Sequence, residues 1–302
     1  MIHYSRASRD ELAAVAAFVA SLNVHSAHRI GYFGDKPEEV GRELLENGAI
    51  DHSFITRQDD SVIGFMAMDI DEELNRSYFY GPLVDHEPWD EVARGLVERC
   101  LELVPDGATG QLEMFFDLDN SNLTGLGRSL GFETYKDVRT LRFDRADLAN
   151  LERGTAAPLD VQHHDGLVAL HDRLFPNTYL PARRMIEGLG EHKICFVLAE
   201  DGEILGYVYL EVDDSTGAAS LEFVGTDERA RGRGIGADLV RTGLHWMFGF
   251  SSVSETWLVV DEDNLGAQKL YWRLGWTEVH RMTSMRLAGR PSSIPGGTRA
   301  PS

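Results

Sequence analysis

The hydrophobic pattern of this chain changes period in the same order twice. Apolar residues recur at helical spacing near the start of each half, then alternate with polar residues as in β-strands, and later return to helical spacing. The main predicted helices are 10–22, 88–103, 165–175 and 234–248. The predicted strands are 53–57, 63–70, 77–83, 112–116 and 139–143, then 194–199, 204–212, 220–226, 256–260 and 282–287. This order predicts helices packed against a sheet in each half.

Individual residues repeat together with the pattern. Asp119-Asn120 and Leu130-Gly131-Phe132 recur 144 positions later as Asp263-Asn264 and Leu274-Gly275-Trp276. Such long-period similarity indicates a duplicated structural unit. We therefore expect an α/β fold (mixed α+β) of two tandem domains, each a mostly antiparallel mixed sheet flanked by helices. The expected domains are residues 1–148 and 155–288, followed by a disordered tail at 289–302 that is rich in Gly, Pro and Ser.

Composition argues against two classes of partner. The chain has 302 residues and a net charge of −20, which disfavours the basic face that nucleic-acid binding requires. No apolar run approaches the roughly 20 residues of a membrane span, and the N-terminus lacks a secretory signal pattern. We therefore expect a cytoplasmic protein with no membrane partner, present as a monomer or a homodimer. The acidity is compatible with a cationic substrate, although solubility alone also accounts for it.

A glycine-rich segment in the second half has the layout of an anion site. The strand predicted at 220–226 is followed by Arg231-Gly232-Arg233-Gly234-Ile235-Gly236-Ala237, which opens into the next helix. The first N–H groups of a helix have no intrahelical partner and lie at the positive end of its dipole, so they bind phosphate groups. The same segment is also compatible with a tight strand-to-helix turn, and it matches neither a Walker loop nor the dinucleotide fingerprint.

A second motif makes the segment more specific. Arg231, Gly234 and Gly236 form Arg-x-x-Gly-x-Gly, and the second motif consists of Asn264, Ala267, Tyr271, Leu274 and Gly275. Together they resemble the GNAT superfamily of N-acetyltransferases, and the strand order extends the resemblance over residues 155–288. The resemblance implies an acyl-CoA N-acyltransferase that uses acetyl-CoA as co-substrate, needs no metal, and is catalytic in its second half.

The resemblance also implies roles for individual residues. Backbone groups of Val224 and Thr226 would pair with the pantetheine arm, and Asn264 would contact the cofactor arm. The N–H groups of the loop would hold the pyrophosphate: Gly232, Arg233, Gly234, Ile235, Gly236 and Ala237, with added charge from Arg231.

Two side chains would carry the chemistry. Tyr271 would protonate the departing thiolate, and Glu222 would accept a proton from an amine that attacks the thioester directly. From the residues alone, Glu222 can also be an exposed or ion-paired strand carboxylate, and Tyr271 can be a packing residue.

The first half lacks the corresponding loop. At the same offset, positions 231–236 correspond to Glu87-Pro88-Trp89-Asp90-Glu91-Val92, which is acidic, has no glycine and contains a proline without an N–H. Position 271 corresponds to Gly127. Asn120 is retained, but asparagine is also a common helix N-cap. We therefore predict that residues 1–148 form a degenerate GNAT-like domain without a CoA loop.

The acceptor is expected to contact the loop that follows the first helix of the second half. This loop, 174–181, contains two prolines and two aromatic residues, and its Tyr179 either lines the acceptor site or packs internally. His25 and His28 have no evident third ligand, so we predict no metal site there.

Three functions fit these features. The first is transfer of an acetyl group to a primary amine of a small molecule or a peptide. The second, within the same superfamily, is a mycothiol-synthase-like acetyltransferase, since that enzyme is also a tandem pair. The third is a non-catalytic acyl-CoA-binding regulatory module, against which Tyr271 and the intact loop count.

Overall fold

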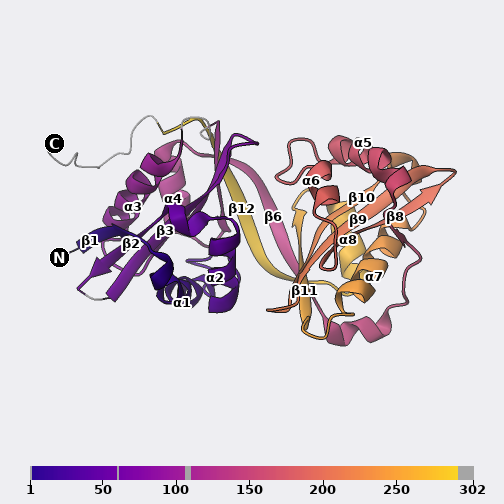
Figure 1. Cartoon of the computed structure of the whole chain (residues 1–302), viewed down its shortest axis with the longest axis horizontal. Helices are drawn as coiled ribbons and strands as arrows, with labels where there is room; N and C mark the ends of the chain where they lie inside the picture. Colours follow the sequence, from indigo (N-terminus) through magenta and orange to yellow (C-terminus); the bar gives the residue numbers. More distant parts are fainter. Residues whose placement is uncertain (1, 60, 106–109, 292–302) are drawn as a thin grey trace. The chain divides into compact units, whose positions relative to one another are not determined.

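The computed structural model describes residues 2–59, 61–105 and 110–291, so most of the predicted tail lies outside the described residues. The chain divides into two compact units (Figure 1). Unit 1 consists of Met1–Val138 together with His280–Ser302, and unit 2 consists of Arg139–Val279. Both units are mixed α/β structures, as the sequence predicts.

Unit 1 contains a sheet in which neighbouring strands are antiparallel from β1 to β4, while β4 and β5 are parallel. Its strands are β1 (Ile2–Arg6), β2 (Ser53–Gln58), β3 (Ser61–Asp71), β4 (Arg76–Val84) and β5 (Gln111–Asp117). Its helices are α1 (Leu12–Asn23), α2 (Pro37–Glu46), α3 (Trp89–Leu103) and α4 (Ser121–Leu130). The sequence pattern did not predict β1 or α2, although Pro37 and the acids after it are a typical helix start.

Unit 2 repeats this plan. Its strands are β7 (Ala157–Pro158), β8 (Lys193–Glu200), β9 (Glu203–Asp213), β10 (Ala218–Thr226) and β11 (Glu255–Asp261). Its helices are α5 (His164–Leu174), α6 (Ala182–Glu187), α7 (Ile235–Met247) and α8 (Leu265–Leu274). Strands β7 to β10 are antiparallel to their neighbours, and β10 is parallel to β11. The duplication seen in the sequence is therefore a duplication of the fold.

The last strand of each half is exchanged between the two units. Strand β12 (Thr277–Ala288) pairs with β5 of unit 1, with Met282 opposite Asp117 and Ala288 opposite Gln111. Strand β6 (Glu133–Asp144) lies beside β11 of unit 2 (Figure 1). The units therefore differ from the sequence-based domains 1–148 and 155–288, in which each half closes its own sheet.

Side-chain packing follows this exchange. Met285 and Leu287 pack into the core of unit 1. Leu141 and Phe143 pack into a core of unit 2, where Phe143 contacts Trp276 at 5.6 Å between ring centroids. Each sheet therefore buries apolar side chains that the other half of the sequence supplies.

Unit 2 has a hydrophobic core on each face of its sheet. Helix α7 buries Leu239, Val240 and Leu244 on one face. Helix α5 buries Leu167 and Leu170 on the other. On the α7 face, β9 lies very close to β10 and to the start of α7 at Gly206. A Cβ there would lie 2.7 Å from the Gly225 carbonyl oxygen and 2.8 Å from Ile235 Cγ2. The start of α7 is thereby held directly against β9 and β10.

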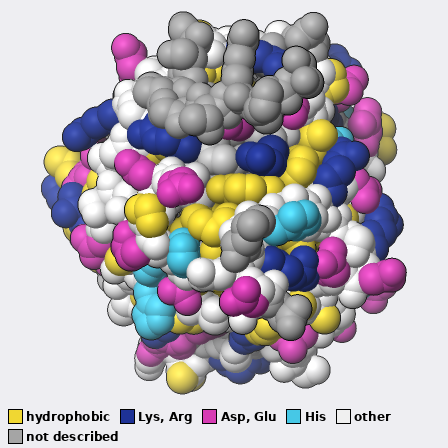
Figure 2. Space-filling view, turned by 90° about the vertical axis from the view of Figure 1, so that its left-hand side faces the viewer, with side chains coloured by type: hydrophobic (Ala, Val, Ile, Leu, Met, Phe, Trp, Pro, Cys, Tyr) yellow, Lys and Arg dark blue, Asp and Glu magenta, His cyan; other side chains and the backbone are white. Residues whose placement is uncertain are grey.

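Four further properties bear on function. Within the described ranges, no helix is long and apolar enough to cross a membrane, and no group of three or more His, Cys, Asp or Glu side chains could hold a metal ion. Cys100 and Cys195 are both buried, and burial raises the pKa of each thiol. The face of unit 1 in Figure 2 carries acidic and basic side chains interspersed, which differs from the basic surface of a nucleic-acid-binding domain.

Candidate functional site

The glycine-rich loop joins β10 to α7. Strand β10 ends at Thr226, a short 3-10 helix spans Glu228–Ala230, and α7 begins at Ile235. Gly232 and Gly234 have φ angles of +78° and +83°, in the left-handed region that L-residues with a Cβ rarely adopt. Gly234 is the N-cap of α7, and no side chain caps this helix. Glycine is thus required by backbone conformation at both positions.

Several backbone N–H groups at this loop lack a protein partner. In the described part of the chain, no hydrogen bond engages the N–H of Gly232, Gly234, Ile235, Gly236 or Ala237. The N–H of Arg233 instead donates to the Ala230 carbonyl at 3.4 Å. Unpaired amides at a helix N-terminus attract anions. Five of the six amides predicted to face a pyrophosphate are therefore available to one.

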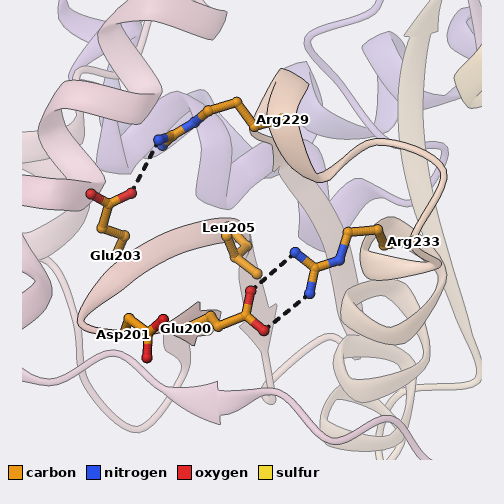
Figure 3. A pocket seen from close by; sticks show the side chains of 6 residues that line it. All are labelled: Glu200, Asp201, Glu203, Leu205, Arg229 and Arg233. Carbon is orange, nitrogen blue, oxygen red and sulfur yellow. Dashed lines mark hydrogen bonds and ion pairs between the residues drawn. The ribbon is translucent and has the colours of Figure 1, made fainter.

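The arginines near this loop are all ion-paired. Arg233 contacts both carboxylate oxygens of Glu200, at 3.1 and 3.3 Å, and Arg229 contacts Glu203 at 3.1 Å (Figure 3). Arg231 lies 3.5 Å from Glu228. A cavity of about 320 Å³ lies between the β8–β9 turn and the loop, and is lined by Glu200, Asp201, Glu203, Leu205, Arg229 and Arg233. The turn carboxylates therefore offset the positive charge beside the free amides.

Asp227 anchors the start of the loop. It is 4% exposed and accepts hydrogen bonds from the backbone and side chain of Arg229 and from Arg173 of α5, the last at 2.7 Å. These donors, with Arg229 first, lower the pKa of Asp227 to about 2. Asp227 was not among the predicted site residues, although an aspartate directly before a helical turn is a typical N-cap.

Strands β10 and β11 separate beside the loop. Their parallel pairing is limited to Ser220 opposite Trp257. Val224 and Thr226 lie beyond that point and pair on their other side with Val208 and Gly206 of β9. The β11-facing edge of this stretch therefore has backbone groups to which an extended ligand can add as a strand.

Glu222 lies at a bulge in β10, where the register with β9 shifts between Leu221 and Phe223. The phenol of Tyr179 donates a hydrogen bond to its carboxylate, and the Tyr179 ring stacks on Phe223 at 5.5 Å. Burial raises the pKa of Glu222, and nearby Glu211 adds to this rise, whereas hydrogen bonds from Ser220 and Tyr179 and the charge of Lys193 oppose it. A carboxylate with a raised pKa suits the role of a general base near neutral pH.

Tyr271 lies in the hydrophobic core on the α7 side. It is 6% exposed and contacts Trp276 at 5.9 Å between ring centroids, and burial raises its pKa. No hydrogen bond joins Tyr271 to Glu222 or to the glycine loop among the described residues. The structure does not directly link the two residues predicted to carry the chemistry.

Asn264 caps α8, with its side-chain oxygen accepting from the Ala267 N–H at 3.1 Å. Asn120 caps α4 of unit 1 in the same way, accepting from the Leu123 N–H at 3.0 Å. Helix capping thus accounts for the repeated asparagine in both units, and the amide nitrogen of Asn264 is the group left for a cofactor contact.

The helix start in unit 1 is built differently. Helix α3 begins at Trp89 after the N-cap Pro88, which has no N–H. The Trp89 N–H donates to the carboxylate of Glu87 at 3.2 Å, and Asp90 and Glu91 occupy the first turn. Carboxylates therefore already complement this helix dipole, and they would repel a phosphate.

Comparison with known proteins agrees with the geometry of unit 2. Residues 165–276 match the model of the acetyltransferase (GNAT) family. This segment is therefore similar to GNAT acetyltransferases. It includes nearly all of α5, the glycine loop and α8, and therefore every predicted site residue.

Two sequence relatives are mycothiol acetyltransferases. The one from Mycolicibacterium gilvum (strain PYR-GCK) is 38% identical over 92 residues, which cover 28% of this chain and 30% of the relative. The one from Streptomyces griseus is 36% identical over 83 residues, covering 27% of each chain. The chain thus matches less than a third of the length of these relatives, a span about the size of the GNAT segment.

Solved structures extend the similarity to the whole fold. A GCN5-related N-acetyltransferase from Sphaerobacter thermophilus superposes with a TM-score of 0.72 at 17% identity, covering 96% of both chains. A tandem GNAT protein from the clavulanic acid biosynthesis pathway has a TM-score of 0.66 at 14% identity and covers 97% of this chain and 100% of its own. At these identities the likeness concerns the fold, and it shows that the described architecture is a tandem GNAT fold.

Proposed function

We propose that unit 2 is an N-acetyltransferase that moves an acetyl group from acetyl-CoA to a primary amine of a small molecule or a peptide. The observation that carries the proposal is the set of five N–H groups, those of Gly232 and of Gly234 to Ala237, that have no partner among the described residues. They lie next to the edge of β10 that faces β11 beyond Ser220. A pyrophosphate and an amide-containing arm are the ligand groups that such a pair of features accepts. Acetyl-CoA contains both.

In the proposed reaction, Glu222 and Tyr271 each take part in one proton transfer. The amine nitrogen attacks the thioester carbonyl carbon, so that a C–N bond forms and the C–S bond breaks. Glu222 accepts the proton that the amine loses, and Tyr271 or solvent supplies a proton to the departing thiolate. A thiol with an ordinary pKa of about 8.5 is a fair leaving group, so that second transfer contributes modestly.

The pKa of Glu222 determines the expected pH profile. Glu222 acts as a base in its deprotonated form, and burial raises its pKa above the ordinary value of 4.5. The rate at limiting amine is therefore expected to rise with pH through a limb that lies above pH 4.5.

Acetyl-CoA turnover tests the proposal. The intact chain is incubated with acetyl-CoA and a panel of primary amines, and free thiol release is measured. We expect release that depends on an amine, and a loss of kcat/KM of about 100-fold in Glu222→Gln with unchanged affinity for CoA. Binding of CoA without acylation of any acceptor would instead support an acyl-CoA-binding regulatory module.

A second candidate is a mycothiol-acetyltransferase-like activity. The sequence relatives favour it, because the two described above carry that name. The acceptor used by those relatives, added to the amine panel, separates the two candidates. A kcat/KM that exceeds those of simple amines by a factor of 100 or so would favour the second candidate.

A further inference from the structure

A buried histidine joins helix α5 to the loop that carries Tyr179. His171 is 0% exposed. Its Nε2 lies 3.1 Å from the Leu180 carbonyl oxygen, and its Nδ1 lies 2.5 Å from the hydroxyl of Tyr207 on β9. A carbonyl oxygen accepts but cannot donate, so Nε2 carries the proton and Nδ1 accepts from Tyr207. Both ring nitrogens of a neutral histidine are thereby satisfied.

The loop that His171 holds leads directly to Glu222. Tyr179, the residue before Leu180, stacks on Phe223 and donates to the Glu222 carboxylate. The His171 ring also lies 4.9 Å from Phe223 and 5.4 Å from Phe175. The histidine thus contacts both ends of the loop and the strand residue on which Tyr179 rests.

Tyr179 itself is partly exposed. It is 48% accessible, and among the described residues its side chain donates a hydrogen bond to Glu222 and stacks on Phe223, with Glu211 and Tyr209 nearby. Exposed loop segments with few packed contacts open at low free-energy cost. A buried hydrogen bond at the adjacent carbonyl is therefore well placed to keep the loop closed.

We propose that His171 is a positioning residue, which holds the loop 175–180 against β10 and so keeps Tyr179 on Glu222. This inference rests on the proposed role of Glu222 as the base. Tyr207 supports the arrangement by occupying Nδ1.

Two variants that distinguish the contributions of the His171 Nδ1 and Nε2 atoms test the proposal. An asparagine side chain reaches about as far as Nδ1 and loses the Leu180 bond, whereas a glutamine reaches about as far as Nε2 and can keep it. We expect His171→Asn to lower kcat/KM for the amine about tenfold, mainly through KM, and His171→Gln to retain most of it. The Kd for CoA should stay within about twofold in both.

A double-mutant cycle distinguishes positioning from general destabilisation. In the background of Tyr179→Ala, His171→Asn should lower kcat/KM for the amine by less than about twofold, because the side chain through which His171 acts is already absent. A roughly tenfold fall in kcat/KM for the amine in both backgrounds overturns the proposal. A roughly tenfold rise in the Kd for CoA in His171→Asn also overturns it.

A matched control is available on α7. His245 Nε2 also bonds a loop carbonyl, that of Leu151 at 3.0 Å, on the opposite core of the same unit. His245→Asn removes the same type of bond and should leave amine kinetics unchanged. Loss of amine kinetics in this control to the same extent would contradict a specific role of His171.

Hydrogen–deuterium exchange measures how readily the loop opens, independently of catalytic activity. Peptides covering 174–181 should exchange several-fold faster in His171→Asn than in the wild type and in His245→Asn. If His171→Asn does not fold, Tyr207→Phe should show the same acceleration to a lesser degree. Unchanged exchange of these peptides in the folded variants overturns the proposal. If the wild type has no acetyltransferase activity but exchange still accelerates in His171→Asn, the result counts against the proposed function alone.

Discussion

The two units begin the same helix in two different ways. In unit 2, glycines in left-handed conformation lead into α7, and five amides have no partner in the described part of the chain. In unit 1, Pro88 removes an amide and the Glu87 carboxylate occupies another at the start of α3. The two helices pack against equivalent strands, so the fold does not decide which unit can hold an anion. A few residues at one helix N-terminus decide it.

The largest expected effect comes from filling the glycine loop. Gly234→Val places a β-branched residue at φ +83°, which strains the loop and moves the N-terminal amides of α7. We expect the Kd for CoA to rise on the order of 100-fold, about 2.7 kcal/mol, as measured by calorimetry.

The matched control is Gly48→Val in unit 1. Gly48 also has a positive φ, +65°, and open space around its Cβ position. It should lower stability by a similar mechanism while leaving the Kd for CoA unchanged. Equal CoA binding by Gly234→Val and the wild type would show that the two helix starts do not differ in the way described above.

Tyr271 provides the next comparison, because the equivalent position in unit 1 is Gly127. Tyr271→Phe keeps the ring packed on Trp276 and removes the hydroxyl. We expect kcat to fall about tenfold with little change in the Kd for CoA. An unchanged kcat in steady-state assays would make Tyr271 a packing residue in unit 2.

A carboxylate of unit 1, Glu43, is expected to make the stability of the fold depend on pH. In unit 1, burial raises the pKa of Glu43 to about 7, and the hydroxyl of Tyr80 and the amide of Asn47 bond its carboxylate. A raised folded-state pKa stabilises the fold fully below the unfolded value of about 4.5, and this contribution is lost as the pH rises through about 7.

Glu43→Gln should therefore reduce the loss of stability between pH 5 and pH 8 by about 1–2 kcal/mol, measured by urea unfolding of the transition that includes unit 1. Glu38→Gln, which removes an exposed carboxylate near the start of the same helix, is the control. An equal pH dependence in the wild type and Glu43→Gln would contradict the assignment.

The smallest effect is expected at the rim of the glycine loop. Glu200→Gln frees Arg233, whose ion pair with Glu200 is about half exposed on both sides. Exposed pairs contribute less than about 1 kcal/mol, so we expect CoA binding to tighten about threefold, and less at high salt. Asp51→Asn, which breaks the similarly exposed pair with Arg9 in unit 1, should leave CoA affinity unchanged. Weaker binding by Glu200→Gln would mean that the pair stabilises the loop.

The elements with a strong local signal were predicted correctly. Helix α7 and strands β8 to β11 lie within a few residues of the predicted ranges, because their periodicity extends over whole segments. Short or isolated elements such as β1 and α6 were missed, since a few residues give no measurable period. The family resemblance was confirmed for residues 165–276, and the roles of Glu222, Tyr271 and Asn264 stay predictions.

What the sequence by itself determined is local. The duplication, the order of helices and strands, and the contrast between Gly232-Arg233-Gly234 and Glu87-Pro88 depend on residues close together along the chain. The tertiary structure decided which strands each last strand joins: β12 pairs with β5 of unit 1, and β6 lies beside β11 of unit 2. It also decided that Tyr179 meets Glu222 and that His171 meets Tyr207, pairs 43 and 36 residues apart. Such contacts form when distant segments pack, and no pattern within one segment specifies them.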